Sequence, residues 1–227
     1  MKKLFLHSLP AGGVDFYCQK LIALKKPLIL VFLVLLLDQA LKFYIKLSMT
    51  IGQEHLIADW FIIHFTENNG MAFGLEFAGE WGKLALSSFR ILAVAAIFIY
   101  LTILTRKKVR FGPVFGISMI LAGALGNIID SAFYGLFFSN SSYHTVAQFM
   151  PEAGGYASFL HGKVVDMFYF PLLILRQAEA PSWIPQFIFG SDGHFIFFRP
   201  VFNIADAAIT TGVLWLLLFE RKFLKGH

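Results

Sequence analysis

A few carboxylate and amide side chains of this sequence stand in strongly apolar surroundings, where ionisable groups are costly. Asn127 and Asp130 in GNIID, and Asn203 and Asp206 in FNIAD, are each three positions apart, so each pair shares one face of a helix. Asp166 lies in another apolar run, VVDMFYF. Two carboxyl groups held close together share one proton, so that one can act as a base and the other as an acid. Acid–base chemistry by these aspartates is the first hypothesis.

Several of these polar groups also have a structural interpretation. Asp38 and Lys42 are four positions apart in LDQALK, and they could form an ion pair that only holds the helices together. Asn127 and Asp130 could belong to a packing seam, because Gly123 and neighbouring small residues allow helices to approach closely. Asp130, however, falls near the end of a predicted helix, where the helix dipole opposes a negative charge, so we expect another reason for its position.

Asp166 and Asp206 are harder to explain structurally. Asp166 could be a solvated loop residue, but its neighbours are too apolar for that. Asp206 is predicted about two turns inside an apolar helix, roughly 9 Å along its axis. A carboxylate at that depth should face a water-filled cleft or share a proton.

The composition places these residues in an integral membrane protein. Hydrophobic residues make up 57% of the 227 residues, Phe alone occurs 27 times, and the mean hydropathy is +0.68. A single cysteine excludes an intramolecular disulfide and a thiolate metal cluster, and no metal-binding His motif occurs, so we expect no metal and no cofactor. The net charge of +5 is compatible with nucleic-acid binding, but no nucleic-acid motif supports it, and basic residues of membrane proteins mark cytoplasmic loops.

Four apolar segments are long enough to cross a bilayer, which takes about 20 residues. They are predicted as helices over residues 27–48, 84–105, 112–134 and 200–219. The run WFIIHFTENNGMAFGLEF alternates apolar residues around a glycine turn, which predicts short strands, and GSDGHFIFFRP predicts a turn and another strand. The predicted fold class is an all-α membrane protein of four transmembrane helices with a small β platform at the outer membrane surface.

Basic residues set the predicted orientation. Five lysines precede the first helix, four basic residues separate the second helix from the third, and three follow the fourth helix. By the positive-inside rule both termini lie in the cytoplasm, and residues 49–83 and 135–199 face outward. The predicted domains are a cytoplasmic N-terminal segment over 1–26, a membrane domain over 27–220 and a cytoplasmic tail over 221–227. The first segment lacks the apolar core of a signal peptide.

Five sequence blocks together resemble lipoprotein signal peptidases, the type II signal peptidases of bacteria. In chain order they are LDQALK, NNGMAFG, GNIID, VVDMF and FNIAD, spread over residues 27–220. The resemblance implies an intramembrane aspartyl endopeptidase of the bacterial inner membrane, with its active site near the outer (periplasmic) face. It also implies that the enzyme removes signal peptides from prolipoproteins that carry diacylglycerol, cleaving on the N-terminal side of the lipidated cysteine.

The resemblance further assigns roles to individual residues. It implies that Asp166 and Asp206 form the catalytic dyad, without deciding which of them is the base. Residues that would bind substrate or support the site are Asn68, Gly70, Asn127, Asp130, Asn203, Asp38 and Lys42. The expected partners are the diacylglyceryl prolipoprotein and membrane lipid, not nucleic acid, and the chain is expected to act as a monomer.

The chain departs from the family pattern at two places. Where the family usually carries Arg after the GNxxD block, this chain has Ser131. Three residues that could supply a positive charge instead are Arg90, Lys163 and Arg199. The outer segments are also longer than usual, and we expect the extra residues, roughly 137–161 and 175–194, to form a cover outside the membrane.

Two other functions remain open from the sequence. A small transporter or proton channel could use Asp38, Asp130 and Asp206 as a relay, although four helices without an internal repeat are few for a transporter. A membrane assembly factor could use the polar seams only to bind partner helices. An assay for cleavage of a prolipoprotein separates both from a peptidase.

Overall fold

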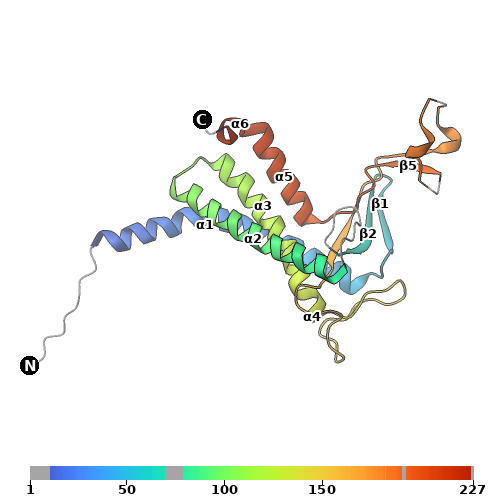
Figure 1. Ribbon diagram of the computed structural model, residues 1–227, viewed down its shortest axis with the longest axis horizontal. Coiled ribbons are helices and arrows are strands. Elements are labelled where there is room, and N and C mark those ends of the chain that lie inside the picture. The colour runs from blue at the N-terminus through green and yellow to red at the C-terminus, as the bar shows by residue number, and fades with distance from the viewer. Residues whose placement is uncertain (1–10, 70–78, 182, 191–192, 226–227) are drawn as a thin grey trace, which may run out of the picture.

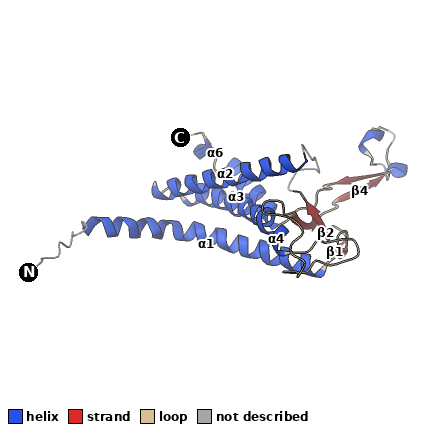
Figure 2. Cartoon of the chain, turned by 60° about the horizontal axis from the view of Figure 1, so that its bottom comes forward, coloured by secondary structure: helices blue, strands red, loops and turns tan. Residues whose placement is uncertain are grey.

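The computed structural model describes residues 11–69, 79–181, 183–190 and 193–225. Long helices lie side by side, and short strands gather beyond one end of them (Figures 1 and 2). The fold class predicted from the sequence, a mainly helical membrane protein with a small sheet, is confirmed. Gly70, which was expected to support the site, lies outside the described residues.

Four helices form the body of the molecule. They are α1 (Ala11–Ser48), α2 (Gly79–Arg106), α3 (Phe111–Ile129) and α5 (Ile204–Phe219). The shorter elements are a π-helical turn, Asp130–Tyr134, that continues α3 into α4 (Gly135–Phe137), and α6 (Arg221–Leu224) after α5. The described segments that are long and apolar enough to cross a membrane are Leu24–Ser48, Ala85–Arg106 and Phe111–Phe137. With 16 residues, or about 24 Å, α5 is shorter than the hydrocarbon core of a bilayer.

Three predicted helix starts are wrong, and α2 begins at Gly79 instead of residue 84. The helix α1 begins at Ala11 and runs through Pro27, which removes one hydrogen bond from the helix without ending it. The helix α5 begins at Ile204 instead of residue 200, because Asn203 adopts an extended backbone and caps it. Asp206 is therefore in the first turn of α5 and not two turns inside it.

Three strands form an antiparallel sheet at one end of the helices, which we call the platform. In sheet order they are β1 (Glu54–Ala58), β2 (Phe61–Asn68) and β3 (Val164–Tyr169). The register sets Thr66 of β2 opposite Asp166 of β3, so the platform carries one of the predicted catalytic residues in its last strand. A second sheet projects beyond the platform (Figure 1) and pairs β4 (Leu173–Arg176) with β5 (His194–Phe197).

Glycines let α3 approach its neighbours closely, as the sequence predicted. A Cβ atom added at Gly123 would lie 2.1 Å from the carbonyl oxygen of Ala205 on α5. A Cβ atom at Gly126 would lie 2.7 Å from a carboxylate oxygen of Asp38 on α1. The small residues of α3 therefore allow the polar residues of α1, α3 and α5 to lie close together.

The residues 138–163, which make up most of one predicted insertion, fold back over the platform end of α3. The backbone N–H of Gly162 donates to the carbonyl oxygen of Ser131 at 2.8 Å. A Cβ atom at Gly162 would lie 2.2 Å from the carbonyl oxygen of Asp130, so only glycine fits this contact. The segment thereby packs directly against the π-helical turn.

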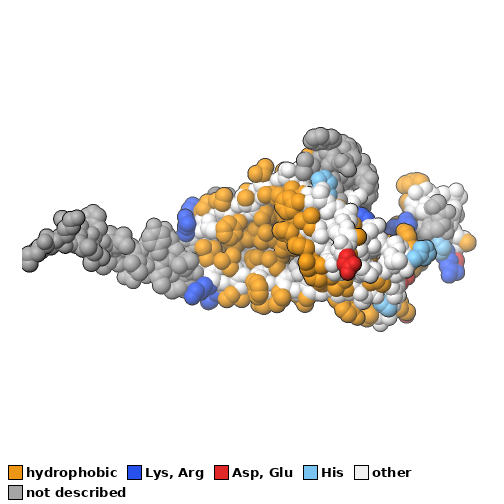
Figure 3. Space-filling model, turned by 90° about the horizontal axis from the view of Figure 1, so that it is seen from below, with side chains coloured by type: hydrophobic (Ala, Val, Ile, Leu, Met, Phe, Trp, Pro, Cys, Tyr) orange, Lys and Arg blue, Asp and Glu red, His pale blue; other side chains and the backbone are white. Residues whose placement is uncertain are grey.

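The surface of the helices separates into an apolar belt and charged ends. In the view of Figure 3, hydrophobic side chains cover the helices, and Lys and Arg side chains lie at the limit of the belt away from the platform. We call this the basic end, and the residues that define it are Arg106, Lys107, Lys108, Arg110, Arg221 and Lys222. There Trp215 Nε1 of α5 donates to the carbonyl oxygen of Gly112 at 3.1 Å, which ties the later part of α5 to the start of α3.

Candidate active site

Asn203 caps α5 and contacts two carboxyl groups. Its Oδ1 accepts a hydrogen bond from the backbone N–H of Asp206 at 2.9 Å, and its own backbone N–H donates to Asp206 Oδ2 at 3.4 Å, which is a capping box. Its Nδ2 donates to Asp166 Oδ1 at 2.7 Å and to the carbonyl oxygen of Val165 at 3.2 Å. One fully buried asparagine thus connects the carboxyl group on the helix with the one on the strand.

Asp206 is half-buried in the first turn of α5. Asn127 of α3 donates from Nδ2 to Asp206 Oδ1 at 2.8 Å. The dipole of the helix N-terminus and these N–H donors favour a negative charge at this position. A carboxylate at the start of an apolar helix is thereby stabilised without being buried deeply.

Asp166 stands within β3 and is only 3% exposed. Besides the bond from Asn203, its Oδ2 accepts a hydrogen bond from Asn68 Nδ2 of β2 at 3.4 Å. Burial, and then the nearby charge of Asp206, raise the pKa of Asp166 to about 7. Asp166 therefore keeps its proton at a pH where a solvated aspartate is fully ionised.

Main-chain hydrogen bonds fasten β3 to the residues that precede α5. The N–H of Phe168 donates to the carbonyl oxygen of Phe202 at 2.7 Å, and the N–H of Phe202 donates back to the carbonyl oxygen of Phe168 at 3.0 Å. The N–H of Met167 donates to the same oxygen of Phe202 at 3.1 Å. The strand of Asp166 and the helix of Asp206 are thus joined by backbone one residue before the cap.

Lys42 of α1 is fully buried and neutralises two carboxylates. Its Nζ lies 2.9 Å from Asp38 Oδ2 and 2.8 Å from Asp130 Oδ2, and it donates to Asn127 Oδ1 at 3.0 Å. The other oxygen of Asp38 accepts a hydrogen bond from the backbone N–H of Ala205 at 2.9 Å, at the start of α5. The predicted ion pair of Asp38 with Lys42 is confirmed, and Asp130 joins it.

Asp130 directly follows the last residue of α3, near a helix end as predicted. The helical backbone continues beyond it through the π-helical turn to Phe137. The carboxylate of Asp130 also accepts hydrogen bonds from Gln39 Nε2 at 2.9 Å and from the backbone N–H of Val165 at 3.3 Å. Asp130 therefore links α1, α3 and β3. Gln39 was missed by sequence reasoning although it stands inside LDQALK.

Sequence reasoning also missed a second buried network. Glu67 of β2 is ion-paired with Lys46 of α1, and its Oε1 accepts a hydrogen bond from Ser141 Oγ at 2.9 Å. The Nζ of Lys163 lies 3.4 Å from the other oxygen of Glu67. One signal was present in the sequence, since Lys46 follows Lys42 by four positions and so shares its helix face.

Of the three residues that were expected to supply a positive charge beside the site, one interacts with it. Ser131 is buried and its Oγ bonds a carbonyl oxygen of its own helix. Arg90 of α2 is half-buried and close enough for an electrostatic interaction with Asp206. Lys163 instead belongs to the second buried network, and Arg199 is exposed. Across the described part of the chain, no group of three or more His, Cys, Asp or Glu side chains is arranged to hold a metal ion.

Known proteins are similar to this chain in sequence and in the arrangement of their helices. Residues 30–221 match the family described as Signal peptidase (SPase) II. The lipoprotein signal peptidase of Porphyromonas gingivalis is 46% identical over 190 residues, which cover 83% of this chain and 80% of that protein. The lipoprotein signal peptidase of Amoebophilus asiaticus is 35% identical over 193 residues, which cover 83% of this chain and 75% of that protein. A solved bacterial membrane enzyme, 23% identical, has a TM-score of 0.55 over 87% of this chain and 88% of its own, which supports the fold.

Proposed function

The chain belongs to the signal peptidase II family, and we propose that Asp166 and Asp206 are the acid and the base of its peptidase reaction. The enzyme is an aspartic-type hydrolase, and its substrates are prolipoproteins. The observation that carries the proposal is that Asn203 donates to both carboxyl groups, to Asp166 from its side-chain amide and to Asp206 from its backbone N–H. The surroundings of the two groups differ, and this difference supports a separate role for each.

In the proposed reaction the ionised Asp206 takes a proton from a water molecule, whose oxygen attacks the scissile carbonyl carbon. The protonated Asp166 gives its proton to the carbonyl oxygen, so that a neutral tetrahedral diol forms. Asp206 then passes its proton to the leaving nitrogen while Asp166 takes a proton back from a hydroxyl of the diol. The C–N bond breaks into an acid and an amine, and both side chains return to their starting states.

The supporting residues act through hydrogen bonds and packing in this proposal. Three asparagines orient the two carboxyl groups, and they are Asn68, Asn127 and Asn203. A buried ion cluster holds α1, α3 and the start of α5 in register, and its members are Asp38, Lys42 and Asp130. Oriented donors of this kind need no rearrangement when charge develops on the substrate.

The position of Asp206 supports a site at the membrane surface. Since Asp206 stands in the first turn of α5 on the platform side, the cleaved bond would lie near the limit of the apolar belt. The diacylglyceryl chains of a substrate would stay in the bilayer, and cleavage would fall on the N-terminal side of the lipidated cysteine. By the positive-inside rule the platform faces outward, and the segments before residue 27 and after residue 220 are cytoplasmic.

The pH dependence of cleavage should reflect the acid role of Asp166. We expect kcat/KM to fall as the pH rises through about 7, because the proton of Asp166 is lost there and cannot be donated. The change Asn68→Ala should move this decline to higher pH, because the Asn68 N–H stabilises the ionised form of Asp166. The measurement is cleavage of a diacylglyceryl prolipoprotein between acidic and alkaline pH. A constant rate over that range would remove Asp166 from the acid role.

The charge of Arg90 is expected to assist the reaction at Asp206. Removing it by Arg90→Ala should lower kcat/KM by about tenfold, because the guanidinium attracts the carboxylate of Asp206. Arg90→Lys should restore most of the rate, which a purely structural role of the guanidinium would not allow. Arg199→Ala is the matched control, since Arg199 is exposed. Equal rates for wild type and Arg90→Ala would refute the assignment.

The function itself is tested with purified protein and a diacylglyceryl prolipoprotein in detergent. Release of the signal peptide, followed by mass spectrometry, identifies the cleaved bond. The transporter hypothesis is less consistent with the site, because Asp38, Asp130, Asp166 and Asp206 belong to one polar cluster of ion pairs and hydrogen bonds instead of spreading along the helices. Proton flux into liposomes without any peptide release would reverse that preference.

A further inference from the structure

A cavity of about 510 Å³ lies at the basic end of the bundle, far along α3 from the proposed active site. It is bordered by α1, by the first turns of α3 and by the turn that joins α2 to α3. Much of its wall is apolar and includes Leu30, Val114 and Phe115. Pockets of this size commonly hold small molecules.

The hydroxyl groups in this mainly apolar wall already have hydrogen-bond partners. Thr105 Oγ1 donates to the carbonyl oxygen of Thr102 at 2.9 Å, and Ser118 Oγ donates to that of Val114 at 2.7 Å. Both hydroxyl groups donate to a backbone carbonyl oxygen of their own helix, so neither needs a polar ligand as a partner. The wall therefore suits a hydrocarbon chain better than a polar molecule.

Two exposed lysines also line the cavity. They are Lys26 on α1 and Lys108 in the turn between α2 and α3. The backbone of Lys108 has a φ of 52°, a left-handed conformation that is uncommon for a residue with a side chain and that persists only when its surroundings impose it. Glu220, an acidic residue at this end, is ion-paired with Arg110 and is not part of the cavity wall.

An apolar wall beside two ammonium groups fits a ligand that has a hydrocarbon chain and a negative head. Basic pockets between membrane helices bind anionic lipid headgroups. We propose that this cavity binds an anionic phospholipid, with an acyl chain along Leu30, Val114 and Phe115 and its phosphate near Lys26 and Lys108. The site is separate from the peptidase site and does not depend on the assignment of the two aspartates.

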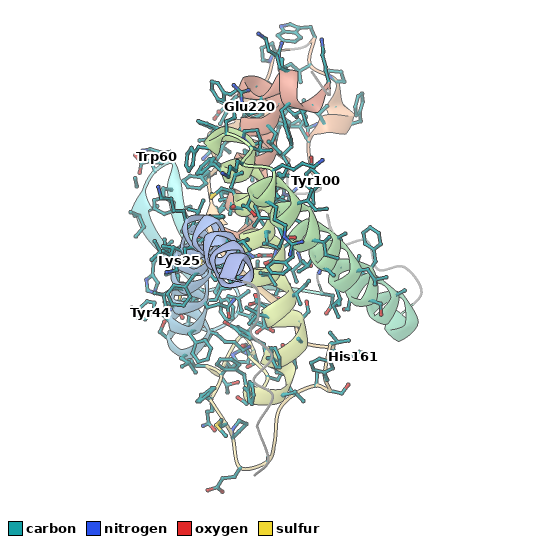
Figure 4. The ribbon with its side chains drawn as sticks, turned by 90° about the vertical axis from the view of Figure 1, so that its left-hand side faces the viewer. Lys25, Tyr44, Trp60, Tyr100, His161 and Glu220 are labelled. Carbon is teal, nitrogen blue, oxygen red and sulfur yellow. The ribbon has the colours of Figure 1, made fainter. Side chains whose placement is uncertain are left out.

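Native mass spectrometry of the full-length protein in detergent tests this site. The protein is titrated with phosphatidylglycerol or with phosphatidylcholine of the same acyl chains. We expect tighter retention of phosphatidylglycerol, and we expect the double change Lys26→Gln with Lys108→Gln to weaken its binding by about tenfold or more. The matched control is Lys25→Gln with Lys107→Gln, which removes the same charge from the same helix and turn but outside the cavity wall. Lys25 lies on α1 as labelled in Figure 4.

A second variant tests the cavity without changing charge. Leu30→Trp should fill the space beside α1 and lower the binding of both lipids, while prolipoprotein cleavage reports that the protein is folded. Equal binding of the two lipids to wild type, or an equal loss in the control pair, would overturn the proposal. Glycerol phosphate, which has the head but no acyl chain, should not compete. Competition by it at equal concentration would indicate a simple anion site and would also overturn the proposal.

Discussion

Asp166→Asn is expected to lower the rate of prolipoprotein cleavage by at least about a thousandfold, within the range that general acid–base groups contribute. Asparagine keeps the shape of the side chain but cannot release a proton to the substrate. Asp206→Asn should cause a similar loss, because the two carboxyl groups act as one unit and their effects do not add. The measurement is the single-turnover rate with a diacylglyceryl prolipoprotein. Asp59→Asn is the matched control, because Asp59 is exposed next to the same sheet.

The substitution Asp166→Asn should also make the protein more stable at neutral and alkaline pH. The pKa of Asp166 is raised to about 7, so the folded protein holds this proton more tightly than the unfolded chain does. That contribution to stability is complete below the ordinary pKa of aspartate, about 4, and is lost as the pH rises through about 7. The amide of the variant cannot ionise, so the stability of the variant should not decline over this interval. An inactive variant that unfolds more easily than wild type at alkaline pH would contradict this expectation.

Lys42→Met is expected to destabilise the protein by about 3–5 kcal/mol, because it leaves two buried carboxylates without their shared cation. The ammonium group lies 2.9 Å from Asp38 and 2.8 Å from Asp130, and all three side chains are at most 1% exposed. Unfolding in detergent, followed by intrinsic fluorescence during a denaturant titration, measures the effect. Lys25→Met on the same helix is the control, since Lys25 is exposed and its loss should change stability little.

A second substitution separates charge from packing in this cluster. Adding Asp130→Asn to Lys42→Met should recover part of the lost stability, because one uncompensated carboxylate is then neutral. The double variant would instead be less stable than Lys42→Met alone if Asp130 mattered mainly through its hydrogen bonds to Gln39 and Val165. The sign of the difference therefore decides which contribution dominates.

The parts of the fold that depend on single segments were predictable from the sequence. The apolar runs predicted the four long helices, and the alternation around Phe61 predicted the strand β2. Asp206 was singled out because a carboxylate in an apolar helix requires compensation. Its depth was wrong because the start of α5 depends on the cap made by Asn203. Residues 200–202, although apolar, precede the helix, and Phe202 bonds to β3.

Contacts between distant segments were not predictable in the same way. The spacing of Asp38 and Lys42 predicted their ion pair, but the third member, Asp130, is brought in only by the packing of α3 on α1. Glu67 resembled an ordinary residue of a polar turn, since nothing nearby in the sequence shows that Lys46 and Ser141 surround it. The π-helical turn that begins at Asp130 likewise leaves no distinctive pattern in GNIIDSAFY.

The reciprocal backbone bonds between Phe168 and Phe202 have a consequence for how such an enzyme can diverge. These main-chain bonds set the distance between the strand of Asp166 and the helix of Asp206. The distance therefore does not depend directly on the surrounding side chains. From Asp166 to this bridge is two residues, and from the bridge to Asp206 is four. An insertion or deletion within this short path would change this distance, whereas substitutions that keep the backbone bonds would not.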